Sequence, residues 1–288
     1  MKAIYKRELS SYFNSMIGYL CIAVMVAFIG VYFMAYNLFS GYPYFSYSLA
    51  STLFIFMVIV PILTMRSMAE ERHSRTDQLL LTAPVSVTEV VMGKYLAMLT
   101  VYLIPVLISC LCPLIIAMNG TAYLKADYSA VLAFFLYGAV EIAVGLFISA
   151  LTESQIIAAV GTFGALLVLY LWDGLIDYLP TTASGSLIGL LVILILVCLL
   201  LQSLSGSHKV SGSVLALGAA AIVGFYLKDS SAFASLLPNA LGKFSLSGVF
   251  TNFVNNQVFD VAGLAMYVSV AALMVFLTVQ VVQKRRWS

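Results

Sequence analysis

Two Gly-Lys pairs are the residues that come nearest to a phosphate-binding motif. A Walker A loop requires Gly-x-x-x-x-Gly-Lys-Ser/Thr, because its backbone amides hold the phosphates and its hydroxyl holds magnesium. Gly93-Lys94 is followed by tyrosine and Gly242-Lys243 by phenylalanine, so neither pair completes the motif. The sequence also contains neither HExxH nor GxSxG. We therefore predict that this chain is not an enzyme, has no catalytic residues and does not hydrolyse ATP.

The cysteines and histidines do not have the spacing of a metal site. All four cysteines lie inside apolar runs, and Cys110-x-Cys112 has no second pair. The only histidines are His73 and His208. Cysteines in such surroundings are typically small buried hydrophobic residues. We expect no metal ion and no cofactor in this chain.

Glu141 is the one ionisable residue near the middle of a predicted membrane span. A charged side chain at that depth costs about 2.5–3.5 kcal/mol on insertion scales, so a function is the first hypothesis to consider. No lysine or arginine lies at a matching depth in another predicted span, which argues against an ion pair within the chain. Two interpretations stay open: a substrate or proton role, and a buried carboxyl with a structural role.

The composition indicates whether most of this chain is surrounded by water or by lipid. Of the 288 residues, 62% are hydrophobic and 9% charged, whereas a soluble domain has about 25% charged residues. Backbone groups in lipid must be satisfied internally, which leaves helices or closed barrels. Barrel strands read as alternating segments of about 10 residues. Long apolar runs such as Met16–Tyr36 and Leu187–Leu204 instead predict an all-α, polytopic helix bundle.

A spanning helix needs about 20 mainly apolar residues. The first candidate is longer than the apolar part of a signal peptide, so we interpret it as a retained span. The third contains Pro105 and Pro113, which predict a kink or tilt, or a helix that ends before Pro113. The eight predicted spans are 16–36, 47–65, 90–118, 128–151, 154–172, 186–204, 210–227 and 260–283.

The distribution of basic residues predicts how this bundle is oriented in the membrane. If the N-terminus is cytoplasmic, only Lys125, Lys228 and Lys243 of the 14 lysines and arginines fall on the outside. This bias is the one that the positive-inside rule describes. The sequence therefore predicts that both termini are cytoplasmic.

Residues 1–14 are predicted to form a helix outside the spans. Its apolar positions recur with helical spacing, and Lys2, Lys6 and Arg7 lie mostly off that stripe. An amphipathic helix of this kind suits the cytoplasmic membrane interface. The alternative is a short extension of the first span.

The segment 66–89 is predicted to be a cytoplasmic helix–break–helix element. Ser74-x-x-Asp77 predicts a cap for a short helix that a proline ends. Ser86-x-x-Glu89 is a capping box that opens the third span.

Three adjacent leucines, Leu79–Leu81, belong to the short helix of this segment. They cannot all face one side, so part of this apolar surface is exposed unless a partner covers it. The residues alone leave two interpretations open: a partner-binding element, and a solvated loop that joins two spans.

A tight cytoplasmic turn is predicted between the fourth and fifth spans. Thr152-x-x-Gln155 is interpreted as the cap of the fifth span, and Glu153 is the only charge in the turn. On the opposite side, residues 228–259 are too polar to span and too apolar for a free linker. This outer segment is predicted to form short helices on or in the outer leaflet.

The stretch MRSMAEERHSRTDQLLLTAPVSVTEVVMGKYLA (Met65–Ala97) resembles the signature region of type 2 ABC transporter permeases, particularly the branch of gliding-motility and sodium-export permeases. The family usually has glycine where Arg75 stands. Ile148–Ala159 and Leu277–Trp287 also resemble that branch. The positions that carry the first match are Arg66, Glu70, Glu71, Arg72, Thr76, Leu79, Leu80, Pro84, Val85, Ser86, Gly93 and Lys94.

The resemblance implies a bacterial plasma-membrane permease subunit of an ATP-driven ABC exporter. Two permease subunits, as a homo- or heterodimer, would form the pathway, and two ATPase subunits would bind ATP and magnesium below them. Arg66–Pro84 would be the coupling helix that docks into the ATPase. The family core has six spans, which implies an extra pair near 186–227 within one permease domain over 1–288. An accessory extracellular protein is a further expected partner, and nucleic acid is not.

Two other classes of function remain as alternatives. One is a secondary transporter that uses Glu141 as a proton or cation relay, although the sequence shows no internal repeat of the kind such folds carry. The other is a membrane scaffold of an envelope or motility complex that transports nothing.

The carboxyl of Glu141 gives the first testable prediction. We expect Glu141→Gln to impair transport without impairing membrane insertion. The amide has nearly the same size as the carboxyl group but cannot ionise or release a proton. The measurement is transport normalised to the amount of protein in the membrane. Full transport by this variant would contradict a functional role and favour the structural one.

Overall fold

The computed structural model describes residues 1–76, 85–205, 215, 217–220, 222, 224–226 and 233–286. Within these residues the fold is all-α and contains no strand, as the sequence predicts. The chain divides into two compact units. The first consists of Met1–Tyr170 and Leu246–Ser288, and the second of Leu171–Ser245.

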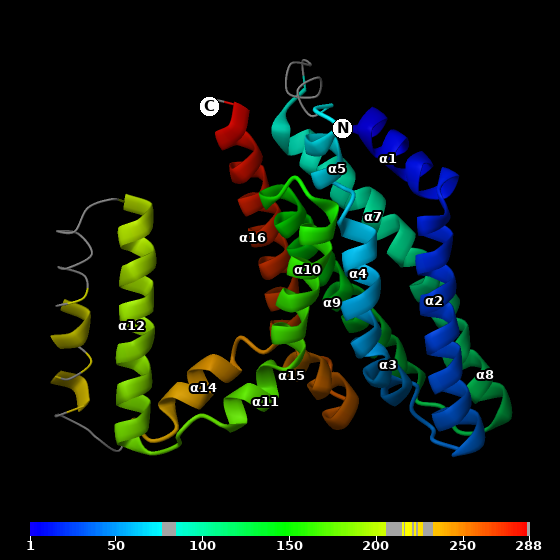
Figure 1. The fold of residues 1–288 in the computed structure, drawn as a ribbon. Helices are drawn as coiled ribbons and strands as arrows, with labels where there is room; N and C mark the ends of the chain where they lie inside the picture. The colour runs from blue at the N-terminus through cyan, green and yellow to red at the C-terminus, as the bar shows by residue number, and fades with distance from the viewer. Residues whose placement is uncertain are drawn as a thin grey trace. The chain divides into compact units, whose positions relative to one another are not determined.

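The first unit is a bundle of apolar helices (Figure 1). Five stretches are long and apolar enough to cross a membrane, and they match five of the eight predicted spans: Met16–Phe39, Ser46–His73, Val87–Asn119, Leu124–Leu151 and Val261–Lys284. The other three predicted spans coincide with shorter apolar helices, Gln155–Tyr170, Ala183–Ile195 and Leu217–Tyr226. After α1 (Lys2–Asn14), the N-terminal half of this unit contains α2 (Met16–Tyr32) with the π-helix η1 (Phe33–Phe39), α3 (Ser46–Thr52) with the 3₁₀ turn η2 (Leu53–Ile55), α4 (Phe56–Thr64) and α5 (Ala69–His73). The helices that follow are α7 (Val87–Ser109), α8 (Leu111–Asn119), α9 (Leu124–Leu151), α10 (Gln155–Tyr170), α15 (Leu246–Thr251) with the π-helix η4 (Asn252–Asn256), and α16 (Val261–Arg286).

Helix α9 is the centre of this bundle, with α4, α7, α10 and α16 packed around it. Two of its glycines allow the neighbouring helices to approach closely. A Cβ added at Gly138 would lie 2.5 Å from the ring of Tyr102, and one at Gly145 would lie 2.4 Å from Oγ1 of Thr64. Small residues at such contacts let helices in lipid approach closely, and this close packing stabilises their association.

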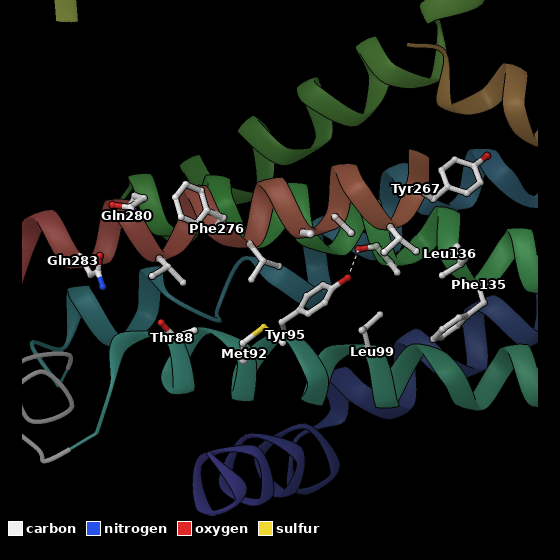
Figure 2. A pocket seen from close by; sticks show the side chains of 16 residues that line it. Thr88, Met92, Tyr95, Leu99, Phe135, Leu136, Tyr267, Phe276, Gln280 and Gln283 are labelled. Carbon is white, nitrogen blue, oxygen red and sulfur yellow. Dashed lines mark hydrogen bonds between the residues drawn. The ribbon is translucent and has the colours of Figure 1, made fainter. Parts of the chain in front are cut away.

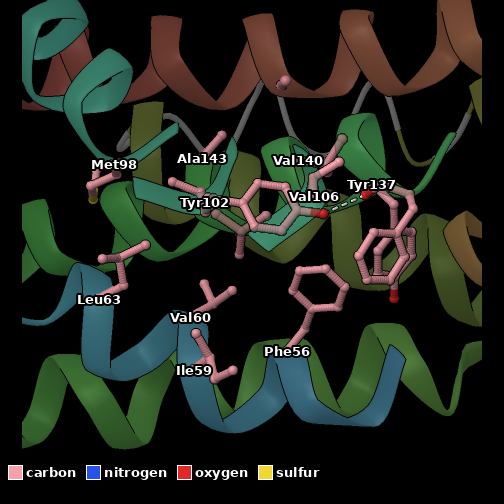
Figure 3. Close-up of a cluster of buried hydrophobic side chains, with 14 of the residues drawn as sticks. Phe56, Ile59, Val60, Leu63, Met98, Tyr102, Val106, Tyr137, Val140 and Ala143 are labelled. Carbon is pink, nitrogen blue, oxygen red and sulfur yellow. Dashed lines mark hydrogen bonds between the residues drawn. The ribbon is translucent and has the colours of Figure 1, made fainter. Parts of the chain in front are cut away.

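Aromatic rings fill the core between α4, α7 and α9 (Figure 3). The ring of Phe56 lies 5.1 Å from that of Phe134 and 5.6 Å from that of Tyr137, and all three side chains are fully buried. Tyr102 donates a hydrogen bond of 2.7 Å to the carbonyl of Phe134. Its hydroxyl is thereby satisfied in surroundings that offer no water.

The third predicted span is interrupted where its prolines stand. Helix α7 includes Pro105 and ends at Ser109, and Pro113 lies in the first turn of α8. A proline in the first turn lacks an N–H that would have no intrahelical partner anyway. The alternative in which the helix ends before Pro113 is confirmed.

Residues Lys2–Asn14 form a separate helix, α1, as predicted. Ser15 is extended, with φ of −103° and ψ of 157°, so α1 does not continue into α2. The alternative of a simple extension of the first span is wrong. Tyr5 and Thr100 of α7 share a hydrogen bond of 2.9 Å between their hydroxyls, and Ile4 is buried. Part of the apolar face that we expected in lipid therefore contacts α7.

The second unit contains α11 (Trp172–Asp177), α12 (Ala183–Ser205) and α14 (Leu236–Gly242). The indole N–H of Trp172 donates to the carbonyl of Leu241 at 3.0 Å, which ties α11 to α14. The extra pair of spans predicted near 186–227 falls within this unit, although residues 206–214 lie outside the described residues. Short helices are present in the predicted outer segment, where α14, α15 and η4 lie.

The contact at Gly145 generates a prediction about stability. We expect Gly145→Ala to lower the free energy of unfolding by about 1–3 kcal/mol, because the new methyl group displaces Thr64 in a closely packed core. Gly164→Ala in α10 is the matched control, since nothing lies within 4 Å of its added Cβ. Thermal unfolding in detergent measures both. Equal unfolding temperatures for the two variants would show that the α4–α9 contact can relax.

Candidate functional site

A charge cluster joins α1, α5 and α7 at the end of the first unit where both chain termini lie (Figure 1). Its central residue is Lys94, which is only 2% exposed. The Nζ of Lys94 donates to the carbonyl of Ser67 at 2.8 Å and lies 2.9 Å from Oε1 of Glu71 and 3.1 Å from Oε1 of Glu8. One ammonium group of α7 thus contacts two other segments of the chain, α1 and residues 67–71.

Arg7 completes the charge cluster, which consists of Arg7, Glu8, Glu71 and Lys94. Its Nη2 donates to Glu71 at 2.7 Å and to Glu8 at 2.5 Å. Each carboxylate therefore accepts from two cations, and the cluster is neutral. A buried charge is tolerated only when its partners satisfy it in this way.

Local sequence features place each member of the cluster. The predicted capping box of α7 is confirmed: the N–H of Glu89 donates to Ser86 Oγ at 3.2 Å, and the N–H of Ser86 donates to Glu89 Oε2 at 3.4 Å. This cap fixes the start of α7 and hence the register of Lys94. At Gly93, an added Cβ would lie 3.1 Å from Ile4. The absence of that Cβ lets α1 pack directly beside the lysine.

Helix α5 is also fixed to the ends of α9 and α10. The N–H groups of Met68 and Ala69 both donate to Ser149 Oγ at 3.2 Å, which satisfies donors at the start of α5. Arg72 forms a salt bridge of 2.6 Å with Glu153, in the turn that leads to α10. The structure thus brings together two predicted site residues that are distant in sequence.

Helix α5 ends in a Schellman motif. The N–H of Thr76 donates to the carbonyl of Glu71 at 2.9 Å, and that of Arg75 to Arg72 at 3.1 Å. Arg75 is left-handed, with φ of 56°, a conformation that favours glycine. A glycine at this position would adopt the left-handed conformation without the strain that the Cβ of arginine brings.

The remaining predicted site residues have different outcomes. Arg66 and Glu70 form a two-bond pair at 2.8 and 2.9 Å, about two-fifths exposed and so of little energetic value. Leu79, Leu80 and Pro84, with residues 77–83 of the predicted short helix, lie outside the described residues.

The predicted cap of the fifth span is wrong in its position. Helix α10 begins at Gln155, and the oxygen that caps it belongs to Ser154, which accepts from the N–H of Ile157 at 3.5 Å. Thr152 Oγ1 instead accepts from the N–H of Ser154 at 3.2 Å.

Sequence reasoning missed three charged residues that the structure uses. Arg7 was predicted only to lie off the apolar stripe of the N-terminal helix, and Glu8 was not considered, yet Arg7 contacts Glu71 and Glu8 contacts Lys94. Asp127 is fully buried, and its Oδ1 accepts from the N–H groups of Phe45 at 2.8 Å and Ser46 at 3.3 Å, so that it caps α3 from another helix. The one available signal was a lone acid among the bases of α1.

A cleft of about 420 Å³ adjoins the charge cluster. Ser11, Tyr12 and Arg66 line it together with the cluster residues. Tyr12 donates to the carbonyl of Leu63 at 2.9 Å, and burial raises the pKa of its hydroxyl above the ordinary value. The phenol therefore acts as a neutral donor that holds α1 against α4.

Glu141 belongs to the core of α9 and not to this site. Its side chain is 1% exposed, and no salt bridge within the described residues includes it. Its role in transport stays a prediction.

A family model described as "ABC-2 family transporter protein" matches residues 5–172, which is more than half of the chain. The chain belongs to the ABC-2 transporter family. This ABC-2 permease is a multi-pass membrane subunit of an ABC transporter. No curated protein matches the chain.

The match includes all four residues of the charge cluster and extends past the end of α10. It ends within two residues of the boundary between the two units. The ABC-2 permease thus carries its cluster in the region common to the family. The gliding-motility or sodium-export branch stays a prediction.

Lys94 gives a testable prediction for this site. We expect Lys94→Met to lower the free energy of unfolding by about 2–3 kcal/mol, because Glu8 and Glu71 would lose a shared cation in a largely buried place. Lys125→Met, an exposed lysine outside the charge cluster, is the control. Thermal unfolding of both variants is the measurement. A change no larger than that of the control would mean that Arg7 alone satisfies both carboxylates.

Proposed function

We propose that this ABC-2 permease is the membrane subunit of an ATP-driven exporter and that the charge cluster transmits the motion of a separate ATPase from α5 to the spans. The observation that carries the proposal is the set of direct bonds from α5 and its flanks to other helices. Glu71 contacts Lys94 of α7, Ser149 caps α5 from α9, and Arg72 reaches Glu153 before α10.

Because of these bonds, a displacement of α5 would also displace the helices that it contacts. The segment that carries α5 leads into residues 77–84 with the three leucines, the surface that we propose the ATPase contacts. Because α5 is bonded to helices on several sides, it cannot shift without moving α1, α7 or the α9–α10 turn. Interfaces of this kind convert small shifts into rearrangements of packed helices.

The partner must supply the energy difference between states. ATP-bound and ATP-free ATPase dimers would have to bind the 66–84 segment differently in order to bias inward-open against outward-open bundles. We propose two ATPase subunits that bind ATP and magnesium, a second permease subunit, and cytoplasmic termini. The placement of both chain ends on the side of α5 supports this orientation (Figure 1). An accessory extracellular protein remains part of the proposal.

The test is affinity purification of the full chain from membranes in mild detergent, followed by identification of co-purifying proteins. We expect an ATPase with a Walker A motif to accompany the wild-type chain and to be lost from Leu79→Ala combined with Leu80→Ala. These side chains are chosen over Glu71 because Glu71 also stabilises the charge cluster.

A matched double variant controls for loss of apolar surface alone. Leu111→Ala with Leu114→Ala removes two exposed leucines from α8, at the opposite end of the α7–α8 pair. We expect this control to keep the ATPase. Loss from both variants would point to a general folding defect, and an ATPase absent even from the wild-type preparation would contradict the exporter proposal.

A further inference from the structure

A long apolar groove lies between α7, α9 and α16, all within the first unit (Figure 2). Its volume is about 550 Å³. Met92 and Leu99 of α7 line it together with Val275 of α16. The hydroxyl of Tyr95, another lining residue, donates to the carbonyl of Ala139 of α9 at 3.0 Å. None of the four residues of the charge cluster lines the groove.

The side-chain amides that line the groove lie at one end of it. Thr88, Gln280 and Gln283 gather there, whereas Phe135 and Tyr267 lie at the other end (Figure 2).

Charged residues adjoin this polar end along both helices. Lys284 is exposed and lies one turn after Gln280 on the same face of α16. Glu89, next to Thr88, lies 3.8 Å from the amino group of Met1, which offsets its charge. An anionic group at this end would therefore meet amide and hydroxyl donors and a lysine.

The dimensions of the groove select the kind of occupant. From Tyr267 to Gln283, α16 rises by about 24 Å at 1.5 Å per residue. A volume of about 550 Å³ spread over that length gives a mean cross-section of about 23 Å². A helix with its side chains is about 10 Å wide and does not fit, whereas carbon atoms pack about 4 Å apart, so an extended hydrocarbon chain does.

We propose that this groove binds a single anionic phospholipid from the leaflet on the side of the C-terminus. One acyl chain lies along α16, and the phosphate accepts hydrogen bonds from Thr88, Gln280 and Gln283 beside Lys284. Because the surrounding bilayer is as apolar as the groove, burial of the chain gives little preference by itself. Selectivity for an anionic lipid comes from the polar end. The site does not depend on coupling to an ATPase.

The experiment uses the purified full chain in detergent, titrated with dioleoyl phosphatidylglycerol or dioleoyl phosphatidylcholine. Native mass spectrometry counts the bound lipids, and thermal unfolding reports stabilisation by binding. We expect wild type to retain phosphatidylglycerol severalfold better than phosphatidylcholine. Ala272→Phe fills the groove and should abolish most of this binding, whereas Ala265→Phe, an exposed alanine of α16 outside the groove, should keep it.

Lys284→Gln separates the two parts of the site. It should lose most of the preference for phosphatidylglycerol and still bind a lipid chain. Equal retention of phosphatidylglycerol by wild type and Ala272→Phe would overturn the proposal, as would equal binding of the two lipids by wild type. A change in oligomeric mass in Ala272→Phe without a change in bound lipid would show instead that a second copy of the chain occupies this face.

Discussion

The end of the first unit where both chain termini lie depends on one ammonium group, that of Lys94. It is withdrawn from water and must be satisfied by the carbonyl of Ser67 and the carboxylates of Glu8 and Glu71. Burial of such a charge is unfavourable unless all its partners are in place. The ion therefore favours the one arrangement in which α1, the end of α4, α5 and α7 meet, and it disfavours arrangements that remove any of them.

Buried backbone groups elsewhere in this permease must likewise find hydrogen-bond partners within the protein. Helix ends expose N–H groups that lipid cannot satisfy, and the chain provides side-chain oxygens from distant helices. Ser149 serves α5 and Asp127 serves α3, each across some eighty residues of sequence. Caps of this kind fix the ends of helices and also bond one span to another. Polar groups in the bundle thus position helices whose apolar surfaces alone would allow them to slide.

The sequence predicted the parts of this fold that depend on local patterns. Apolar runs located the long spans, Pro113 located the end of α7, and Ser86-x-x-Glu89 located its start, because each acts through neighbours along the chain. Pairings between helices were not predictable in this way. Glu8 resembles any surface acid of an amphipathic helix, and only the approach of α1 to Gly93 reveals its partner. The cap of α10 was misplaced by two residues because two hydroxyls compete within one short turn.

The extent of the family match and the extent of the bundle do not coincide, and packing explains the difference. The matched residues stop where α10 ends, but α9 still needs a helix on its remaining face, and α16 packs there after the chain has passed through the second unit. Tyr267 of α16 is fully buried and donates to the carbonyl of Leu246 at 2.7 Å. A core without α16 would expose the aromatic residues that Tyr267 covers, among them Tyr137 at a ring distance of 6.0 Å. The first unit is therefore one folding unit made from two stretches of sequence, and residues 171–245 are an insertion in it.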